Sequence, residues 1–397
     1  MGSDPEFFVV DKKKRVLASD QFFPGKKEPW KFDPLEDEKL TLFFDGIQAE
    51  MNVPASTCRE TISYYIRACL KAADRKIGKN NSIVMQPSIR VRQSTLNNAD
   101  PEARIFGCAP DFNAYTLRQN TPKIDASRHI YRYAGGHIHL GVSSPYLKKS
   151  SIEYKLAKTE DGHIKAIKFI DYVTGAILVM MDKGINAKRR RTKYGTAGCF
   201  RPTPYGFEYR TPSCWWMKSP AAMSLIFGVV RIAWNMLISK LDEDFINQVG
   251  YSQEDLRGIV DESDLVAAKR FWKSLRPYLA IVGRSQYNPL HVLSARTSKN
   301  SGYIGCFKHD KISQNAIKNS KLPTINGGIP VFSLAAFEYM VRHGSDTLVT
   351  DDVAKEWHFN SRQKFHNENG FVDGLHNRLV RNKDFLGFQK DFFAKII

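Results

Sequence analysis

Three long stretches of the chain repeat apolar residues at helical spacing. The first opens with Thr57-Cys58-Arg59-Glu60, which has the form of a capping box, and predicts a helix over about residues 57–76. Two further stretches, 167–181 and 220–241, are apolar at most positions and predict buried helices. The apolar positions of the first helix are Ile62, Tyr65, Ile66, Cys69, Leu70 and Ala73.

Short apolar stretches lie before and between these predicted helices. Their lengths and flanking turn residues predict strands, one of which, 207–211, falls between the second and third helices. Strands alternate with a few long helices and not in regular βαβ units, which indicates an α+β fold with an antiparallel sheet. The other predicted strands span residues 5–10, 48–53, 82–91, 104–115 and 136–142.

The composition changes beyond about residue 240. An acidic opening is followed by helical patterns around 262–282 and 331–343, with loops rich in Gly, Asn and Ser between them. We therefore expect residues 1–240 to form one domain and residues 241–397 to form a mainly helical C-terminal region.

The cysteines and the longest apolar stretch both indicate where in the cell the protein is located. The six cysteines form no Cys-x-x-Cys pair, which is typical of reduced thiols in a cytoplasmic protein. Residues 1–15 contain no apolar run long enough for a signal peptide. Residues 220–238 approach the length of a membrane span, but Arg231 and Asn235 favour a buried helix. We expect a cytoplasmic protein.

Positive charge is concentrated in the front part of the chain. The 397 residues include 59 Lys and Arg against 41 Asp and Glu, and residues 1–240 carry +15 of the net charge of +18. The apolar share of 42% and the charged share of 25% exclude wholesale disorder and a protein with many membrane spans. The excess of positive charge favours acidic partners such as nucleotide phosphates, carboxylates or nucleic acid.

Four short segments each place two polar side chains two positions apart. In a strand, positions i and i+2 point to the same face. If the segments are strands of one sheet, that face gathers four acidic groups, two imidazoles, an amide and an arginine. Buried carboxylates need compensating cations, and carboxylates with an imidazole suit Mg²⁺ or Mn²⁺ held jointly with substrate phosphates. The segments are Asp4-Pro5-Glu6, Gln48-Ala49-Glu50, His137-Ile138-His139 and Glu208-Tyr209-Arg210.

Each segment alone also fits a simpler interpretation. Asp-Pro-Glu is usually a solvated turn, and His-x-His is often a pair of exposed or hydrogen-bonded core histidines. Glu-Tyr-Arg in a strand is commonly a surface ion pair, and the basic run 188–193 is typical of a solvated face. Four same-face pairs in one chain, beside a basic loop, favour the functional interpretation.

The order of these motifs resembles the glutamine-synthetase-like carboxylate-amine ligases. Residues 2–8 (GSDPEFF) resemble their opening strand, and residues 46–50 (GIQAE) are similar to their Gly-Gln-x-Glu strand. Residues 135–141 (GGHIHLG) resemble their Gly-x-His-x-His segment, and residues 201–210 their Arg- and Pro-bearing loop with the Glu-x-Arg strand after it. With residues 106–112 (FGCAPDF) in between, the set looks most like the phage-encoded amidoligases of this superfamily.

This resemblance implies an α+β fold with a glutamine-synthetase-like antiparallel sheet, a half-barrel, flanked by helices. It implies an ATP-dependent ligase: a carboxylate attacks the γ-phosphate to give an acyl phosphate, and an amine then displaces phosphate to form an amide. ATP and Mg²⁺ or Mn²⁺ would be required, with a small-molecule or polymer carboxylate and an amine donor as substrates. A phage-encoded protein of this kind would act in the cytoplasm of the infected host cell.

The resemblance also assigns metal ligands. Glu6 and Glu50 would hold one ion. The second ion would be held by Asp4, His137 and Glu208. Asp4 stands where the family has Glu, which shortens one ligand arm and helps to separate this chain from glutamine synthetase itself.

Further residues match positions that contact substrate. Arg201 and Arg210 would bind the transferred phosphoryl group or the substrate carboxylate, and with Glu208 they form the candidate catalytic set. Gln48 and His139 would orient ligands or touch nucleotide phosphate. Looser candidates for phosphate contacts are Arg190, Arg191 and Lys193. Aromatic residues that either stack a nucleobase or pack the core are Phe7, Tyr133, Tyr205, Trp215 and Trp216.

Two other classes of function stay open at this point. The chain can be a non-catalytic nucleic-acid-binding or structural phage protein on a ligase scaffold, or a metal-dependent hydrolase that uses the same histidines. No proposed ligand position has become apolar, which favours an active enzyme. The charge of the front part further suggests that one substrate is large and anionic, such as nucleic acid or a cell-wall or peptide polymer.

Overall fold

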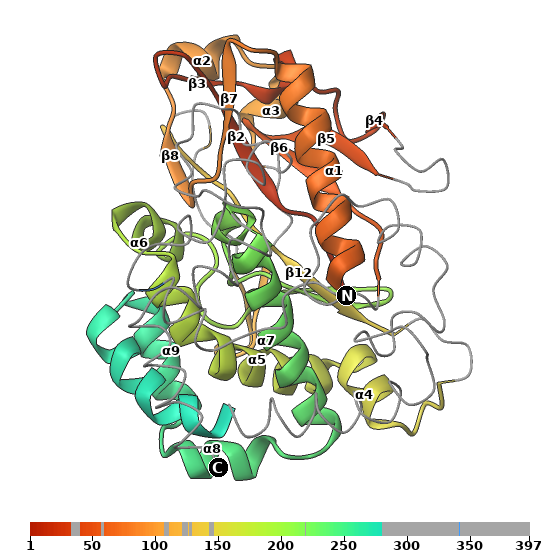
Figure 1. The fold of residues 1–397 in the computed structure, drawn as a ribbon, viewed down its shortest axis with the longest axis vertical. Helices are drawn as coiled ribbons and strands as arrows, with labels where there is room; N and C mark the ends of the chain where they lie inside the picture. Colours follow the sequence, from red (N-terminus) through yellow and green to blue (C-terminus); the bar gives the residue numbers. More distant parts are fainter. Residues whose placement is uncertain are drawn as a thin grey trace, which may run out of the picture.

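Antiparallel sheets and helices make up the described part of the protein, with no closed barrel (Figure 1). The computed structural model describes residues 1–32, 40–56, 59–106, 111–120, 126, 129–142, 147–218, 220–279 and 341. The first sheet has the order β1 (Gly2–Ser3), β12 (Ile138–Gly141), β14 (Gly206–Tyr209), β13 (Cys199–Thr203), β9 (Asp111–Asn113) and β10 (Arg118–Asn120). The second has the order β3 (Val16–Leu17), β2 (Glu6–Asp11), β6 (Gln48–Asn52), β5 (Thr41–Asp45) and β4 (Trp30–Lys31), with β7 (Asn81–Val84) also paired to β2.

The N-terminal segment joins the two sheets. Ser3 pairs with Ile138 of β12 on one side and with Val53 on the other. Glu6, in β2, faces Glu50 of β6 in the same register as the Ser3–Val53 bridge. The break between β1 and β2 falls at Asp4-Pro5, where proline has no N–H for the ladder. The four polar segments therefore lie side by side across this junction.

Apolar side chains alternate with the polar ones and form the core behind the sheets. Phe7, Ala49, Ile138 and Phe207 are all fully buried. The alternation follows from the period of two in a strand, which sends neighbouring side chains to opposite faces. The polar face and the apolar face are thus set by the same short sequence pattern.

A layer of helices covers the apolar face. Helix α5 (Glu160–Met181) packs against β13 and β14, α7 (Pro220–Ile238) contacts α5 and α1, and α1 (Arg59–Ile77) packs against β5 and β7. Tyr209 reaches into this layer from β14, and its hydroxyl donates to Asp171 of α5 over 2.6 Å. The remaining helices are α2 (Gln93–Asn98), α3 (Pro101–Arg104), α4 (Ile152–Lys158), α6 (Ile185–Arg191), α8 (Asp242–Val249) and α9 (Gln253–Asp261). Two 3₁₀ turns span Ser19–Gln21 and Cys214–Lys218, and a separate two-stranded sheet pairs β8 (Ser88–Arg90) with β11 (Tyr131–Tyr133).

The observed elements match the α+β prediction and correct some boundaries. Helix α5 begins at Glu160, earlier than predicted, because the Thr159 side chain caps it by accepting from the Gly162 N–H. The predicted strand 82–91 is two strands, β7 and β8, which Pro87 separates. The predicted strand 104–115 is wrong at its start, since Arg104 ends α3 and β9 begins only at Asp111.

Helices continue beyond residue 240 as far as the structure describes the chain. Residues 265–279 are helical after α8 and α9, and α9 packs against α5. The predicted pattern at 331–343 lies outside the described residues except for Val341, so the division at residue 240 stays a prediction. Among the described helices, none combines the length and the apolar character that crossing a membrane requires.

Candidate functional site

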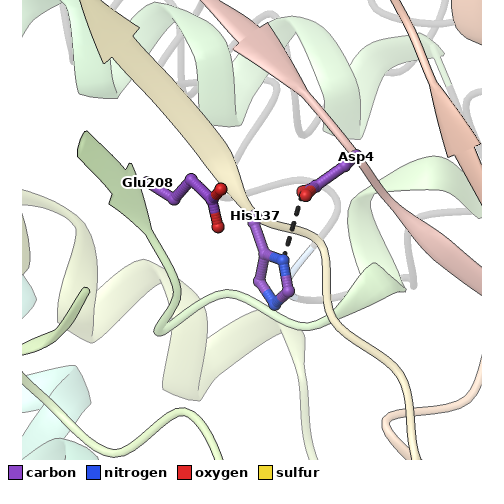
Figure 2. Close-up of side chains that lie close together, drawn as sticks. All are labelled: Asp4, His137 and Glu208. Atoms are coloured by element: carbon purple, nitrogen blue, oxygen red, sulfur yellow. Dashed lines mark hydrogen bonds and ion pairs between the residues drawn. The ribbon is translucent and has the colours of Figure 1, made fainter. Parts of the chain in front are cut away.

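A first group of ligand-type side chains comes from three neighbouring strand segments. Asp4, His137 and Glu208 each offer one ligand atom, and these atoms lie within 4.8 Å of one another. Figure 2 shows the Asp4 carboxylate against the His137 ring, and the Asp4 Oδ1–His137 Nδ1 distance is 3.1 Å. All three residues are buried. We call this set the first acidic group.

Two arginines neutralise the first acidic group. Arg201 Nη2 lies 2.7 Å from a carboxylate oxygen of Glu208, and Arg210 Nη1 lies 2.9 Å from the other. Arg210 also pairs through Nε with Asp111 Oδ1 at 2.6 Å. Burial lowers the pKa of Arg210, but the adjacent Tyr194, Asp111 and Glu208 raise it well above its usual value. The negative charge of the first acidic group is therefore compensated by arginines of the chain itself.

A line of polar contacts leads from the first acidic group toward the surface. His139 Nε2 lies 3.0 Å from Asp4 Oδ1, and its Nδ1 lies 3.0 Å from the Tyr205 hydroxyl. Burial raises the pKa of Asp4, but contacts with His139 and His137 outweigh it and hold that pKa well below the usual range. Burial, with Arg210 nearby, lowers the pKa of His137 to about 4. Asp4 is thus ionised at neutral pH and His137 is neutral, the forms in which both bind metals.

A second acidic group lies across the junction of the sheets. Glu6 and Glu50 face each other on β2 and β6, and Asp45 ends β5 beside them. One ligand atom from each lies within 4.8 Å of the others. No Lys or Arg within the described ranges forms an ion pair with these three. Burial, with the charge of Asp45, raises the pKa of Glu6 to about 8, and burial also raises that of Glu50.

Gln48 completes the second acidic group at the hairpin. It pairs with Asp45 across the turn and shares a face with Glu50, and its side-chain oxygen is buried without a hydrogen-bond partner. Gly46 makes this turn with φ of +71°, and a Cβ there would lie 3.3 Å from the Gln48 Oε1. Three carboxylates and an unpaired amide oxygen are the donors that hard divalent cations prefer, so this residue set fits such an ion.

Not every residue singled out in the sequence reaches the two groups. Arg190 is buried and donates to the backbone carbonyls of Thr211, Arg210 and Pro212. Arg191 is also buried and donates to the carbonyls of Leu178 and Asp182. Their guanidinium groups hold the backbone in place, whereas Lys193 is exposed.

The aromatic candidates divide by exposure. Phe7, Tyr133, Trp215 and Trp216 are buried and belong to the core or its edge. Tyr205 is 39% exposed and stacks on His139 with ring centroids 5.9 Å apart. Among these five, only Tyr205 presents a ring to solvent at the site.

Two acidic residues join the site without having been predicted. Asp45 directly precedes the quoted GIQAE segment, and its place opposite Gln48 follows only once the hairpin register is known. Asp111 sits in the FGCAPDF segment, and β9 places it beside Arg210. A rule that extends each motif by one residue finds Asp45, but no local signal pairs Asp111 with an arginine.

One comparison with known proteins bears on this geometry. Residues 117–254 match the family described as phage phiEco32-like COOH.NH2 ligase-type 2. The chain resembles a phage-type carboxylate-amine ligase. The resemblance expected from the motifs is thereby confirmed, and it supports a ligase. Searches of the curated proteins and of the solved structures return no match.

The matched segment of this ligase-like chain contains only part of the site. It includes His137, His139, Arg201, Glu208 and Arg210. Asp4 and the whole second acidic group lie before residue 117. The fold, and not the matched segment alone, brings the two acidic groups onto one face.

Proposed function

We propose that this protein is an ATP-dependent carboxylate-amine ligase that forms an amide through an acyl phosphate. The observation that carries the proposal is the pair of acidic groups on one buried face, with Arg201 at its partly open side. A ligase must bring an anionic carboxylate to an anionic polyphosphate, and each needs cations and fixed donors around it. The match to a carboxylate-amine ligase family supports this reaction class.

Divalent cations, Mg²⁺ or Mn²⁺, belong to this proposal. The second acidic group would hold one ion through Glu6, Asp45 and Glu50, and the first would hold another through Asp4, His137 and Glu208. When bound, such ions neutralise the β- and γ-phosphates and favour in-line transfer. Because arginines already compensate Glu208, we expect the second acidic group to bind its cation more tightly.

The two arginines have different tasks in the proposed reaction. The Arg201 side chain is 27% exposed and can reach a phosphate or carboxylate with its free guanidinium edge. The Arg210 side chain is only 2% exposed and contacts Glu208, Asp111 and Tyr194. We therefore assign substrate contact to Arg201 and the positioning of Glu208 to Arg210.

The sheet arrangement supports a glutamine-synthetase-like framework as part of the same proposal. The N-terminal segment pairs with β12 and β6 in unbroken registers, so both sheets form one open antiparallel surface across the junction. Helices lie behind this surface, and the acidic groups lie on its other face.

Calorimetric titration of ATP into the full chain, with and without Mg²⁺, tests the proposed function. We expect micromolar binding that requires Mg²⁺ and weakens at least about tenfold in Glu208→Gln, because the isosteric amide removes an anionic ligand of the proposed cation. Glu262→Gln, which changes an exposed carboxylate on another element, should bind as the wild type does. ATP binding that ignores both Mg²⁺ and Glu208 would contradict the proposal.

The raised pKa of Glu6 predicts a pH-dependent affinity for Mg²⁺. Below its pKa of about 8 the carboxyl is protonated, and a cation must displace that proton to bind. Affinity should therefore rise by up to about tenfold per pH unit from pH 6 to 8 and level off above. Titrations in matched ionic strength measure it, with Glu6→Gln as the variant that flattens the profile. A wild-type affinity independent of pH would contradict this expectation.

A further inference from the structure

A basic surface with partly exposed aromatic rings lies where β8, β11 and α6 meet. In register, Arg90 of β8 is opposite Tyr131 of β11. The Arg189 guanidinium of α6 lies 4.0 Å from the centroid of the Tyr131 ring. Burial lowers the pKa of His129, just before β11, and the charges of Arg132 and Lys193 lower it further. We call Arg90, His129, Tyr131, Arg189 and Lys193 the β8–β11 face; β8 and α6 are adjacent on the left of Figure 1.

The cations of this face lack acidic partners. The segments 85–93, 129–134 and 184–194 contain eight Lys and Arg and no Asp or Glu. In the part of the chain that the structure describes, no ion pair involves Arg90, Arg189 or Lys193. Arg189 is instead oriented by neutral groups, donating to Asn186 Oδ1 over 2.8 Å. Unpaired, partly exposed cations held in one place attract a polyanion.

The aromatic rings add flat surfaces beside these charges. The His129 ring stacks on Tyr133, with centroids 5.8 Å apart and planes at 24°, and its Nε2 lies 2.8 Å from the Tyr133 hydroxyl. The Phe106 ring lies 6.3 Å from that of Tyr133. Phe106, His129 and Tyr131 are half-buried, so each residue is packed on one side and partly accessible to solvent.

We propose that the β8–β11 face binds single-stranded nucleic acid. Arg90, Arg189 and Lys193 would contact phosphates, and bases would stack on His129 and Tyr131. Cations alone would attract any polyanion, including an acidic peptide. Half-buried aromatic residues beside the cations favour a nucleic acid, because every base offers a π-face to stack and a carboxylate side chain does not.

The proposed surface adjoins the candidate ligase site. Two residues after β11, the Gly135 N–H donates to the Glu6 carboxylate. Arg189 precedes Arg190, whose side chain is held on the backbone after β14. A single-stranded nucleic acid on the β8–β11 face would therefore lie next to the acidic groups. Binding of this nucleic acid does not depend on ATP or on ligase activity.

Fluorescence anisotropy with labelled oligo(dT) and oligo(U), in the absence of ATP, tests this proposal. Binding should weaken with salt, and the triple variant Arg90→Gln, Arg189→Gln, Lys193→Gln should weaken it at least tenfold. Loss of three phosphate contacts should also lower the slope of log affinity against log salt by about 2. The matched control is Lys12→Gln, Lys13→Gln, Lys149→Gln, which removes the same charge from exposed positions elsewhere and should bind as the wild type does.

Tyr131→Leu separates nucleic acid from other polyanions. It should weaken oligonucleotide binding about tenfold with an unchanged salt slope, since it removes stacking and no charge. Thermal melting of each variant verifies that it is folded. The proposal is overturned if the triple variant binds like its control. It is also overturned if poly-L-glutamate binds as tightly as the oligonucleotides and Tyr131→Leu has no effect, which would indicate an acidic peptide.

Discussion

Arg210→Met is expected to destabilise the protein by about 3–5 kcal/mol, the largest loss predicted for a single substitution at the site. Arg210 is buried between Glu208 and Asp111, at 2.9 and 2.6 Å, and removing its charge leaves Asp111 without its ion-pair partner and Glu208 with Arg201 alone, both in a poorly solvated place. Methionine fills much of the volume, so the loss measures charge more than packing. Denaturant unfolding at pH 7 gives the free energy of unfolding.

Two companion variants make this result interpretable. Arg92→Met changes an exposed arginine and should alter stability by less than about 0.5 kcal/mol. Asp111→Asn combined with Arg210→Met should recover part of the loss, because the unpaired buried charge of Asp111 is gone. A stability equal to that of the wild type in Arg210→Met would mean that the buried ion pairs do not hold the first acidic group together.

Glu50→Gln, unlike Arg210→Met, should stabilise the protein when no divalent cation is bound. Burial, with the charges of Asp4 and Asp45, raises the pKa of Glu50 well above its usual value. A carboxyl whose pKa is raised by folding costs stability as pH rises from its unfolded pKa toward the folded one. At pH 8 without divalent ions, we therefore expect the variant to be more stable than the wild type by about 1–3 kcal/mol.

With added Mg²⁺, the wild type should instead become more stable than Glu50→Gln. A cation that binds only the folded wild type at one hundred times its Kd stabilises it by about 2.7 kcal/mol, and a variant lacking one ligand gains much less. Differential scanning calorimetry with EDTA or with Mg²⁺ measures both effects, and Glu262→Gln is the control, with an exposed carboxylate. If Glu50→Gln lowers stability in EDTA, the second acidic group is already compensated and does not need a cation.

Arg210→Met and Glu50→Gln have opposite expected effects on the free energy of unfolding because the negative charges of the two acidic groups are compensated differently. The first acidic group has Arg201 and Arg210 within hydrogen-bond distance of Glu208. The second has no such arginine among the described residues, and the pKa of Glu6 rises to about 8. We therefore expect an added cation to have its largest effect on the second acidic group.

The sequence alone determined which side chains share the polar face. A strand alternates faces at every residue, so Glu50 follows Gln48 on one side of β6, and the same spacing predicted a shared side for Asp4 and Glu6. The intervening Ala49 and Ile138 are correspondingly buried on the other side. Motif order likewise predicted the resemblance to a ligase family that residues 117–254 match.

Only the tertiary structure decided the partners of these side chains. Asp45 and Asp111 enter the site through a hairpin register and a distant strand, and the burial of Arg190 on backbone carbonyls depends on where α6 packs. Such pairings join residues far apart in the chain, and their energies depend on burial and neighbouring charge, which no local pattern contains. The spacing of residues in a strand determines the face to which a side chain points. The packing of the whole chain determines which residues that side chain contacts.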